Sequence, residues 1–346
     1  MARLIAARRT AVCARGGAFA RMRIEELAAP VLTACLADAG IGAGQVDEVI
    51  LSNALGAGGN PARRAALAAG LPERVAGLTI DRQCAGGLDA ILLARALVDS
   101  GAAEVVLAGG VESYSRRPLR LATDPDGGPP VAYDQAPFTP WPPRRWPGAW
   151  GSGAPGRRPG RRRATLRPAA DLSAEIVALN GVTRDAFPRP LTPKLMSRAP
   201  VLSGSITAAT AAVAADAAAC CLVVSDRIAA GRGLALLSGA TVGGTPEEPG
   251  LAPVAAIRRI WGGEPLAQAE IMEAYAVQAL AVIDAAGLDP AIVNPGGGGL
   301  ARGHPVGASG AILAVRLFHG LRKGRGLAAI AAAGGIGTAL LVVAPA

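Results

Sequence analysis

The decapeptide DRQCAGGLDA, residues 81–90, joins two apolar segments of different character. Residues 75–80 before it are typical of a short buried strand, and the residues from Leu88 to Leu97 have the nearly all-apolar pattern of a buried helix. We therefore expect Cys84 to lie where a strand gives way to a helix. The unpaired N–H groups and the dipole at the start of a helix favour a thiolate there. The local sequence leaves two interpretations open: an activated nucleophile, or a small buried apolar residue.

A second stretch, NPGGGGLARGHPVGASGA at residues 294–311, holds one of the two histidines of the chain. The apolar residues 312–321 that follow it predict a helix. Glycines allow tight turns and a close approach of the backbone to a ligand, so His304 is a candidate general base toward a thiol. The alternative is a buried histidine that holds a loop together.

The composition excludes several classes of protein. The chain has 346 residues, of which 51% are hydrophobic, so it suits two domains or one large duplicated domain and is not disordered as a whole. Its five cysteines are scattered and it has only two histidines, so we expect neither a disulfide framework nor a metal site. This use of cysteine favours a reducing compartment, and we predict a cytoplasmic protein.

Neither end of the chain has the pattern of an export signal or a membrane anchor. The basic residues 1–10 are followed by Gly16 and Gly17 rather than by the apolar core of a secretory signal, and they predict a first strand. The uncharged residues 326–346 are interrupted by the segment GGIG, residues 334–337, which favours two buried strands around a glycine loop. We expect no membrane partner.

The net charge of +9 is concentrated in one segment, because eight arginines and no acidic residue lie between Arg144 and Arg167. The rest of the chain is close to balanced, so the charge is weak support for a nucleic-acid partner and we predict none. Three interpretations of this segment stay open: an arm for an anionic partner, a solvated structureless stretch, or the product of a reading-frame change.

Apolar periodicity predicts alternating strands and helices, which indicates a layered α/β protein. From Pro118 to about Leu202 prolines exclude a long helix, so this part is expected to leave the core. The expected strands are residues 1–10, 46–51, 104–110, 220–225, 234–242, 328–330 and 338–343. The expected helices are residues 25–39, 60–70, 206–219, 270–286 and 312–321.

Five motifs together resemble the thiolase family in order and approximate spacing. They are RT at 9–10, DRQCAGG at 81–87, AGGVESYS at 108–115, GHPVGASG at 303–310 and GGIG at 334–337. The resemblance implies a duplicated thiolase-like fold in which two five-stranded sheets and their helices stack as α-β-α-β-α layers. It divides the chain into an N-terminal half (1–117), an inserted loop domain (118–202, irregular over 144–170) and a C-terminal half (203–346).

The resemblance also implies an activity. Thiolases are homodimers or homotetramers without a metal or a permanently bound cofactor, and their substrates are coenzyme A thioesters. They act as acetyl-CoA C-acyltransferases, which condense acyl groups or cleave 3-ketoacyl-CoA by thiolysis. Carried over, Cys84 is the acyl-accepting nucleophile and His304 its base, and the backbone N–H groups of Cys84 and Ala333 form the oxyanion hole.

The chain departs from the family pattern at three places. Ala331 stands where the family has a second cysteine that moves protons, and Met272 stands where it has an asparagine that holds a water. The segment TAAV, residues 210–213, replaces a polar pattern near coenzyme A. Three hypotheses follow: an acyltransferase on Cys84 impaired in the carbon–carbon step, a catalytically weak homologue acting as a subunit or scaffold, or an acyltransferase whose donor is an acyl carrier protein that meets the arginine segment.

Overall fold

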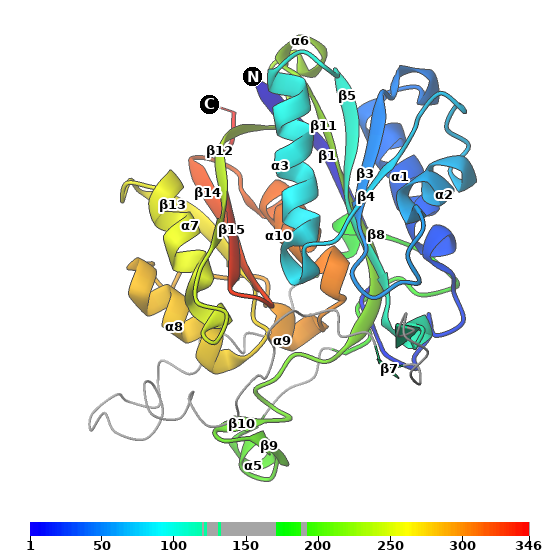
Figure 1. The fold of residues 1–346 in the computed structure, drawn as a ribbon. Helices are drawn as coiled ribbons and strands as arrows, with labels where there is room; N and C mark the ends of the chain where they lie inside the picture. Colours follow the sequence, from blue (N-terminus) through cyan, green and yellow to red (C-terminus); the bar gives the residue numbers. More distant parts are fainter. Residues whose placement is uncertain (120, 123–130, 133–170, 188–191, 346) are drawn as a thin grey trace.

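The computed structural model describes residues 1–119, 121–122, 131–132, 171–187 and 192–345 (Figure 1). The arginine-rich segment from Arg144 to Arg167 lies outside the described residues. The three interpretations of that segment therefore stay predictions, as do the exact bounds of the loop domain.

One large sheet forms the frame of the fold. Its strands are β1 (Ala2–Thr10), β3 (Glu48–Ser52), β4 (Leu78–Ile80), β5 (Val105–Ser113), β11 (Ala215–Ser225), β12 (Leu234–Gly243), β13 (Leu266–Ile271), β14 (Arg325–Ala332) and β15 (Ile336–Val343). They follow the order β13-β14-β15-β12-β1-β11-β5-β3-β4. Two short strands, β2 (Cys13–Ala14) and β8 (Ile176–Val177), pair with this sheet. Two separate pairs are formed by β6 (Leu121–Ala122) with β7 (Val131–Ala132) and by β9 (Val201–Ser203) with β10 (Ile206–Thr207).

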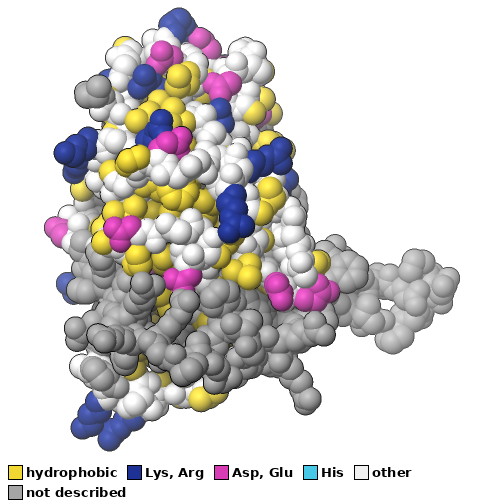
Figure 2. Space-filling model, turned by 90° about the vertical axis from the view of Figure 1, so that its left-hand side faces the viewer, with side chains coloured by type: hydrophobic (Ala, Val, Ile, Leu, Met, Phe, Trp, Pro, Cys, Tyr) yellow, Lys and Arg dark blue, Asp and Glu magenta, His cyan; other side chains and the backbone are white. Residues whose placement is uncertain are grey.

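The helices form three layers with this sheet (Figure 1). They are α1 (Ile24–Ala39), α2 (Pro61–Ala68), α3 (Gly86–Asp99), α5 (Pro193–Ser197), α6 (Asp226–Ala229), α7 (Ala252–Ile260), α8 (Ala276–Ala286), α9 (Gly299–Arg302) and α10 (Val306–Gly320). The first outer layer is α1 with α2, the second is α7 with α8, and α3 and α10 lie between the two halves of the sheet. The outer face of the α7 and α8 layer carries basic and acidic side chains around hydrophobic ones (Figure 2).

Strand β11 shows how the layers are held together, because alternate side chains on a strand point to opposite faces. Cys220 and Leu222 pack with α1 in one apolar cluster, whereas Cys221 and Val223 pack with α3 and α10 in the central one. A third cluster lies under α7 and α8. The predicted α-β-α-β-α layering is confirmed.

The two halves of the sheet are continuous, whereas the resemblance implied two separate sheets. β1 pairs with β11 along most of its length and with β12 at only two positions, through Arg3 and Leu4. Of the described residues, β12 to β15 give the second half four long strands, and β1, β3, β4, β5 and β11 give the first half five.

Most expected elements are present. Gly40 ends α1 in the left-handed conformation at φ 67°, and Asn60 caps α2 by accepting the N–H of Arg63. The apolar C-terminal residues form β14 and β15 around Gly334 and Gly335, both at positive φ. Within the described ranges, no helix is long and apolar enough to cross a membrane.

The predicted helix at residues 206–219 is wrong. Residues 206–207 form β10, and β11 begins at Ala215 and continues to Ser225. Alanine suits a helix, but β11 lies between β1 and β5 with both faces buried, and small side chains let helices pack closely on each face. Tertiary burial therefore overrides local propensity here.

The predicted helix at residues 270–286 is wrong in its first part. Residues up to Ile271 belong to β13, which runs parallel to β14, and α8 starts only at Ala276 after Tyr275. Glu270 lies on β13 and not in a helix, and its buried carboxylate accepts a hydrogen bond from the Gln268 side chain inside the fold.

Residues 171–187 contact the core directly, although they fall within the segment expected to leave it. β8 pairs in parallel with β1, and the fully buried guanidinium of Arg9 binds the carboxylates of Glu175 at 2.7 Å and Asp185 at 2.6 Å. Arg316 on α10 binds Glu175 at 2.6 Å. These ion pairs hold the pKa of both carboxyls below their ordinary values against the opposing effect of burial.

Candidate acyl-transfer site

Cys84 lies on a single 3-10 turn, Gln83–Ala85, between the end of β4 and the start of α3. The turn is sharp, because Gln83 adopts φ 50° in the left-handed region that residues other than glycine rarely occupy. The predicted position of Cys84 between strand and helix is confirmed.

Glycines bring the two sequence motifs into contact. A β-carbon on Gly87 would lie 2.7 Å from backbone atoms of Gly307 and Ala311, and one on Gly310 would lie 2.5 Å from the backbone N of Leu88. A β-carbon on Gly110 of β5 would lie 2.0 Å from the carbonyl oxygen of Gly307. Only glycine allows α3, α10 and β5 to approach so closely, which places the loop before α10 against the turn before α3.

His304 contacts Cys84 through its ring. The Nε2 atom lies 3.2 Å from the Cys84 Sγ atom, and Nδ1 lies 2.6 Å from the Ser309 Oγ atom. The Ser309 hydroxyl donates to the Pro305 carbonyl at 3.2 Å, so its oxygen accepts a hydrogen bond from the Nδ1–H group of His304. That tautomer leaves Nε2 with a free electron pair, which accepts a hydrogen bond from the Cys84 thiol.

The thiol and the imidazole are both uncharged at neutral pH. Burial raises the pKa of Cys84 to about 12 and lowers that of His304 to about 4. The backbone N–H groups of Cys84 and Ala333 act in the opposite direction on Cys84, but burial outweighs them and the Glu112 carboxylate adds to it. The expectation that the helix start holds a thiolate is therefore wrong for the resting site, because the desolvation is larger than the helix effect.

Backbone N–H groups converge on the Cys84 sulfur from both halves of the chain. The N–H of Cys84 itself belongs to the 3-10 turn, and that of Ala333 belongs to the glycine turn between β14 and β15. Both groups lie near the sulfur, and the oxyanion hole predicted from them stays a prediction.

Two of the three departures from the family pattern lie side by side, with Met272 directly after β13 and Ala331 on β14. The backbone N–H of Met272 donates to the carbonyl of Ala329 at 2.9 Å, two residues before Ala331 on β14. The Met272 side chain is buried in the central apolar cluster. Neither Met272 nor Ala331 offers a side-chain proton donor or a primary amide.

Two buried glutamates support the site, and the sequence patterns did not single them out. Glu112 accepts the N–H groups of Ala54, Leu55 and Gly307 and the Nδ2 of Asn53, at 2.8–3.2 Å. Burial raises its pKa to about 7. By accepting the N–H of Gly307 at the start of α10, Glu112 fixes the loop that carries His304. The only sign of this role in the sequence was the position of Glu112 within the motif at 108–115.

Glu273 has the same role beside Met272. It accepts the Asn294 Nδ2 at 2.8 Å and the Leu300 N–H at 3.1 Å, and burial raises its pKa to about 7. Asn294 in turn bonds both backbone groups of Ile271. These bonds join the glycine-rich stretch to the end of β13.

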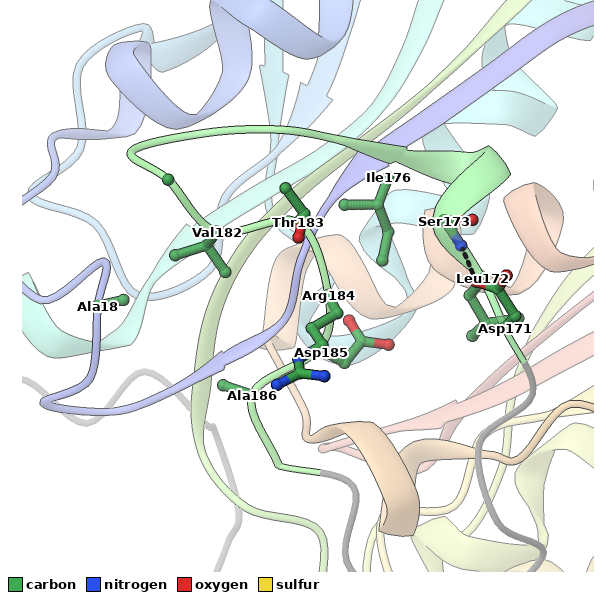
Figure 3. A pocket seen from close by; sticks show the side chains of 11 residues that line it. Ala18, Asp171, Leu172, Ser173, Ile176, Val182, Thr183, Arg184, Asp185 and Ala186 are labelled. Atoms are coloured by element: carbon green, nitrogen blue, oxygen red, sulfur yellow. Dashed lines mark hydrogen bonds between the residues drawn. The ribbon is translucent and has the colours of Figure 1, made fainter.

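A hollow of about 950 Å³ lies elsewhere in the fold, between residues 171–186 and Ala18. Asp171, Thr183, Arg184 and Asp185 surround it (Figure 3). Neither Cys84 nor His304 lines it, so it is separate from the candidate acyl-transfer site. In the parts of the chain that the structure describes, no three His, Cys, Asp or Glu side chains gather as a metal ion would require.

The chain is similar to known proteins along nearly its whole length. Residues 2–135 match the family model of the thiolase N-terminal domain, and residues 233–344 match that of the thiolase C-terminal domain. A putative acetyl-CoA C-acetyltransferase of Bacillus subtilis is 36% identical over 368 residues, with 98% of each chain covered. An acetyl-CoA acetyltransferase of Cupriavidus necator is 34% identical over 393 residues, again with 98% of each chain covered.

Solved structures agree with this assignment. The crystal structure of an acetyl-CoA acetyltransferase of Bacillus anthracis superposes with a TM-score of 0.86 at 29% identity, covering 99% of this chain and 98% of that one. A thiolase of Ascaris suum in complex with coenzyme A has the same TM-score at 24% identity, which supports the fold, with 99% of each chain covered. The chain therefore belongs to the thiolase family and is an acyltransferase of that family.

Proposed function

We propose that this protein transfers an acyl group from a coenzyme A thioester to Cys84, as an acyltransferase of the acetyl-CoA C-acyltransferase type. The observation that carries the proposal is the 3.2 Å contact between Cys84 Sγ and His304 Nε2. A thiol with a raised pKa needs a base within hydrogen-bond reach, and a neutral imidazole is such a base.

The acylation step follows from this geometry. Cys84 Sγ forms a bond to the thioester carbonyl carbon while its proton moves to His304 Nε2, and the Ser309 hydroxyl accepts a hydrogen bond from the Nδ1–H group and so stabilises the imidazolium. The N–H groups of Cys84 and Ala333 bind the oxyanion. The carbon–sulfur bond to coenzyme A then breaks, and the departing sulfur takes the proton from His304.

The subsequent carbon–carbon step, condensation or thiolysis of a 3-ketoacyl-CoA, is the weaker half of this activity. It needs a group that moves a proton at the substrate α-carbon, and Ala331 carries none. Removal of a positioned acid or base costs about 10²–10⁴-fold in rate. We infer slow turnover through this step beside fast acylation.

Release of coenzyme A tests the proposal. The full-length protein mixed with acetyl-CoA should release a burst of free coenzyme A thiol equal to the amount of protein, and Cys84→Ala should release none. Cys13→Ala is the matched control, because Cys13 is a free buried thiol away from the site. Absence of a burst across short and long acyl donors, with a folded protein, contradicts the proposal and supports the scaffold hypothesis.

We also propose a homodimer formed through strand β4. β4 ends the sheet, and Leu78 on it is 44% exposed, so within the described chain its outer edge offers free backbone groups beside an apolar side chain. The opposite edge, β13, is bridged at Ala269 by Val293. In light scattering, Leu78→Lys should lower the mass to that of a monomer, whereas the control Leu67→Lys on α2 should leave it unchanged. An unchanged mass in Leu78→Lys contradicts the proposal. A tetramer would contain a second interface besides the one at β4.

Five free cysteines support a reducing compartment for the protein. Cys13, Cys35, Cys220 and Cys221 are buried without a disulfide. We therefore keep the cytoplasm as the proposed location.

A further inference from the structure

The carbon–carbon step of the proposed function lacks its proton carrier at Ala331, so we searched the site for another one. The family has its second cysteine at the position of Ala331, near the end of β14. A replacement proton carrier therefore has to come from the side of the site on which β13 and β14 end. Tyr275 is a titratable side chain on that side. It lies four residues beyond the end of β13 and directly before α8, and it is half-buried, so substrate can reach it.

The register of the strands places Tyr275 near Ala331. β13 and β14 run in parallel with Ile271 beside Ala329, and the Met272 N–H continues the pairing to the Ala329 carbonyl. Two further residues along each strand bring Glu273 level with Ala331. Tyr275 follows two residues later, about 7 Å along the chain at roughly 3.3 Å per residue.

The segment 210–214 lies between Tyr275 and His304 and pairs with both of them, one on each side. Tyr275 forms a β-bridge with Ala211 on one edge, and His304 forms a β-bridge with Ala214 on the other. Hydrogen bonds of 2.9 Å from Ala212 to Ala274 and of 2.7 Å from His304 to Val213 fix both edges. Tyr275 and His304 therefore lie on the two sides of the segment 210–214, and Tyr275 is close enough to Cys84 for a charge on that thiol to raise the pKa of Tyr275.

The acidic groups around Cys84 are already engaged. Glu112 accepts four N–H donors, and Glu273 is wholly buried and bonds Asn294 and Leu300. Asp81 accepts the N–H of Gln83 and belongs to the N-terminal half. The carboxylates of Glu112 and Glu273 order the loops around the site.

The charge state of Tyr275 decides the direction in which it can act. Burial raises its pKa above the ordinary value, and Cys84 and Tyr114 raise it further. The hydroxyl is protonated at neutral pH, so it suits the donation of a proton and not its abstraction. Donation belongs to thiolysis, in which a carbanion leaves and has to be protonated.

We propose that Tyr275 is the proton donor to the α-carbon of the acyl-CoA that leaves when a 3-ketoacyl-CoA is cleaved on Cys84. The inference rests on the proposed function. Cys84 Sγ, having given its proton to His304, bonds to the 3-keto carbon; the bond between C2 and C3 breaks, its electron pair stays on C2, and the Tyr275 proton moves to C2. An incoming coenzyme A thiol then gives its proton to the Tyr275 oxygen, its sulfur takes the acyl group, and the Cys84 sulfur recovers its proton from His304.

The test compares Tyr275→Phe with Tyr114→Phe in the full-length protein. Tyr114 neighbours Tyr275 and holds Arg15 and Arg117 against its ring, so its phenylalanine variant keeps the packing and removes one hydroxyl. Tyr275→Phe should acylate Cys84 at the wild-type rate but cleave acetoacetyl-CoA about 10²–10⁴-fold more slowly. Incorporation of deuterium from heavy water into C2 of the acetyl-CoA product should fall equally, and Ala331→Cys added to Tyr275→Phe should restore both.

Different failures separate the two proposals. If wild type and Tyr275→Phe cleave acetoacetyl-CoA at equal rates, or if Tyr275→Phe loses acylation together with cleavage, the role of Tyr275 is overturned. A wild-type protein that acylates Cys84 but neither cleaves the substrate nor incorporates deuterium also overturns it and leaves the acylation proposal intact. A wild-type protein that does not acylate Cys84 overturns the proposed function itself.

Discussion

On one side of the site, Cys84, His304 and Ser309 are joined by hydrogen bonds that end at the Pro305 carbonyl; we call these three residues the nucleophile side. On the other side, Met272, directly after β13, and Ala331 on β14 present only apolar side chains; we call these two the acceptor side. The nucleophile side retains the groups that acylation needs, whereas the acceptor side lacks the asparagine and the second cysteine of the family pattern. The comparison teaches that the two half-reactions of one site depend on separable groups.

The largest expected effect comes from breaking the nucleophile side. His304→Ala removes the base that accepts the Cys84 proton, so acylation by acetyl-CoA should slow by about 10²–10⁴-fold. The burst of free coenzyme A, followed in a stopped-flow instrument, measures it. His319→Ala is the control. His319 lies on α10, and its Nε2 atom hydrogen-bonds to the carbonyl of Ala7 on β1, away from Cys84. An equal burst rate in His304→Ala would contradict the role of the imidazole.

The next largest effect should be a faster thiolysis when polar groups are restored on the acceptor side. Ala331→Cys returns a proton carrier to β14, and together with Met272→Asn it should raise the rate of acetoacetyl-CoA thiolysis by about 10²-fold while leaving the acylation burst unchanged. A steady-state thiolysis assay beside the burst assay separates the two. A rise in the burst rate as well would show that the two sides are coupled.

A smaller effect should follow from loosening the nucleophile side. Ser309→Ala removes the group that holds the Nδ1 proton of His304, a hydrogen bond worth about 1 kcal/mol, so acylation should slow by about fivefold to tenfold. The same burst assay measures it. Ser309→Thr keeps the hydroxyl and serves as the comparison; if Ser309→Ala and Ser309→Thr behave alike, packing and not the hydrogen bond decides the rate.

The smallest expected change is with pH. The base form of His304 is the active one, and because its pKa is lowered to about 4 it stays in that form from pH 5 to pH 8. The acylation rate should therefore be nearly flat over this range and fall only as the pH drops toward 4. An ordinary histidine, with a pKa near 6.5, would lose about tenfold by pH 5.5. A decline centred near pH 6.5 would show that the imidazole is exposed in the working enzyme.

The nucleophile and its base were predictable from sequence because rare residues stand in glycine-rich motifs. Cys84 and His304 are such residues, and the structure brings them to 3.2 Å through contacts that only Gly87, Gly110 and Gly310 permit. Their ionisation was not predictable. Burial of Cys84 depends on the whole fold, and it outweighs the local helix effect on which the sequence argument relied.

The errors in the fold have the same origin. β11 is rich in alanine and fits a helix as well as a strand, and only its place between β1 and β5 decides the matter. Glu175 and Asp185 lie far along the chain from Arg9, so no local pattern could announce that they bury its charge. Long-range pairings of this kind are set by topology and not by composition.

The central claim is that Cys84 accepts an acyl group. The most direct measurement is intact-mass analysis of the full-length protein after brief exposure to acetyl-CoA, followed by mapping of the modified peptide. The account predicts an increase of one acetyl group, located on the peptide that contains Cys84 and absent from Cys84→Ala. An unchanged mass, or acetylation that persists in Cys84→Ala on another residue, would contradict it.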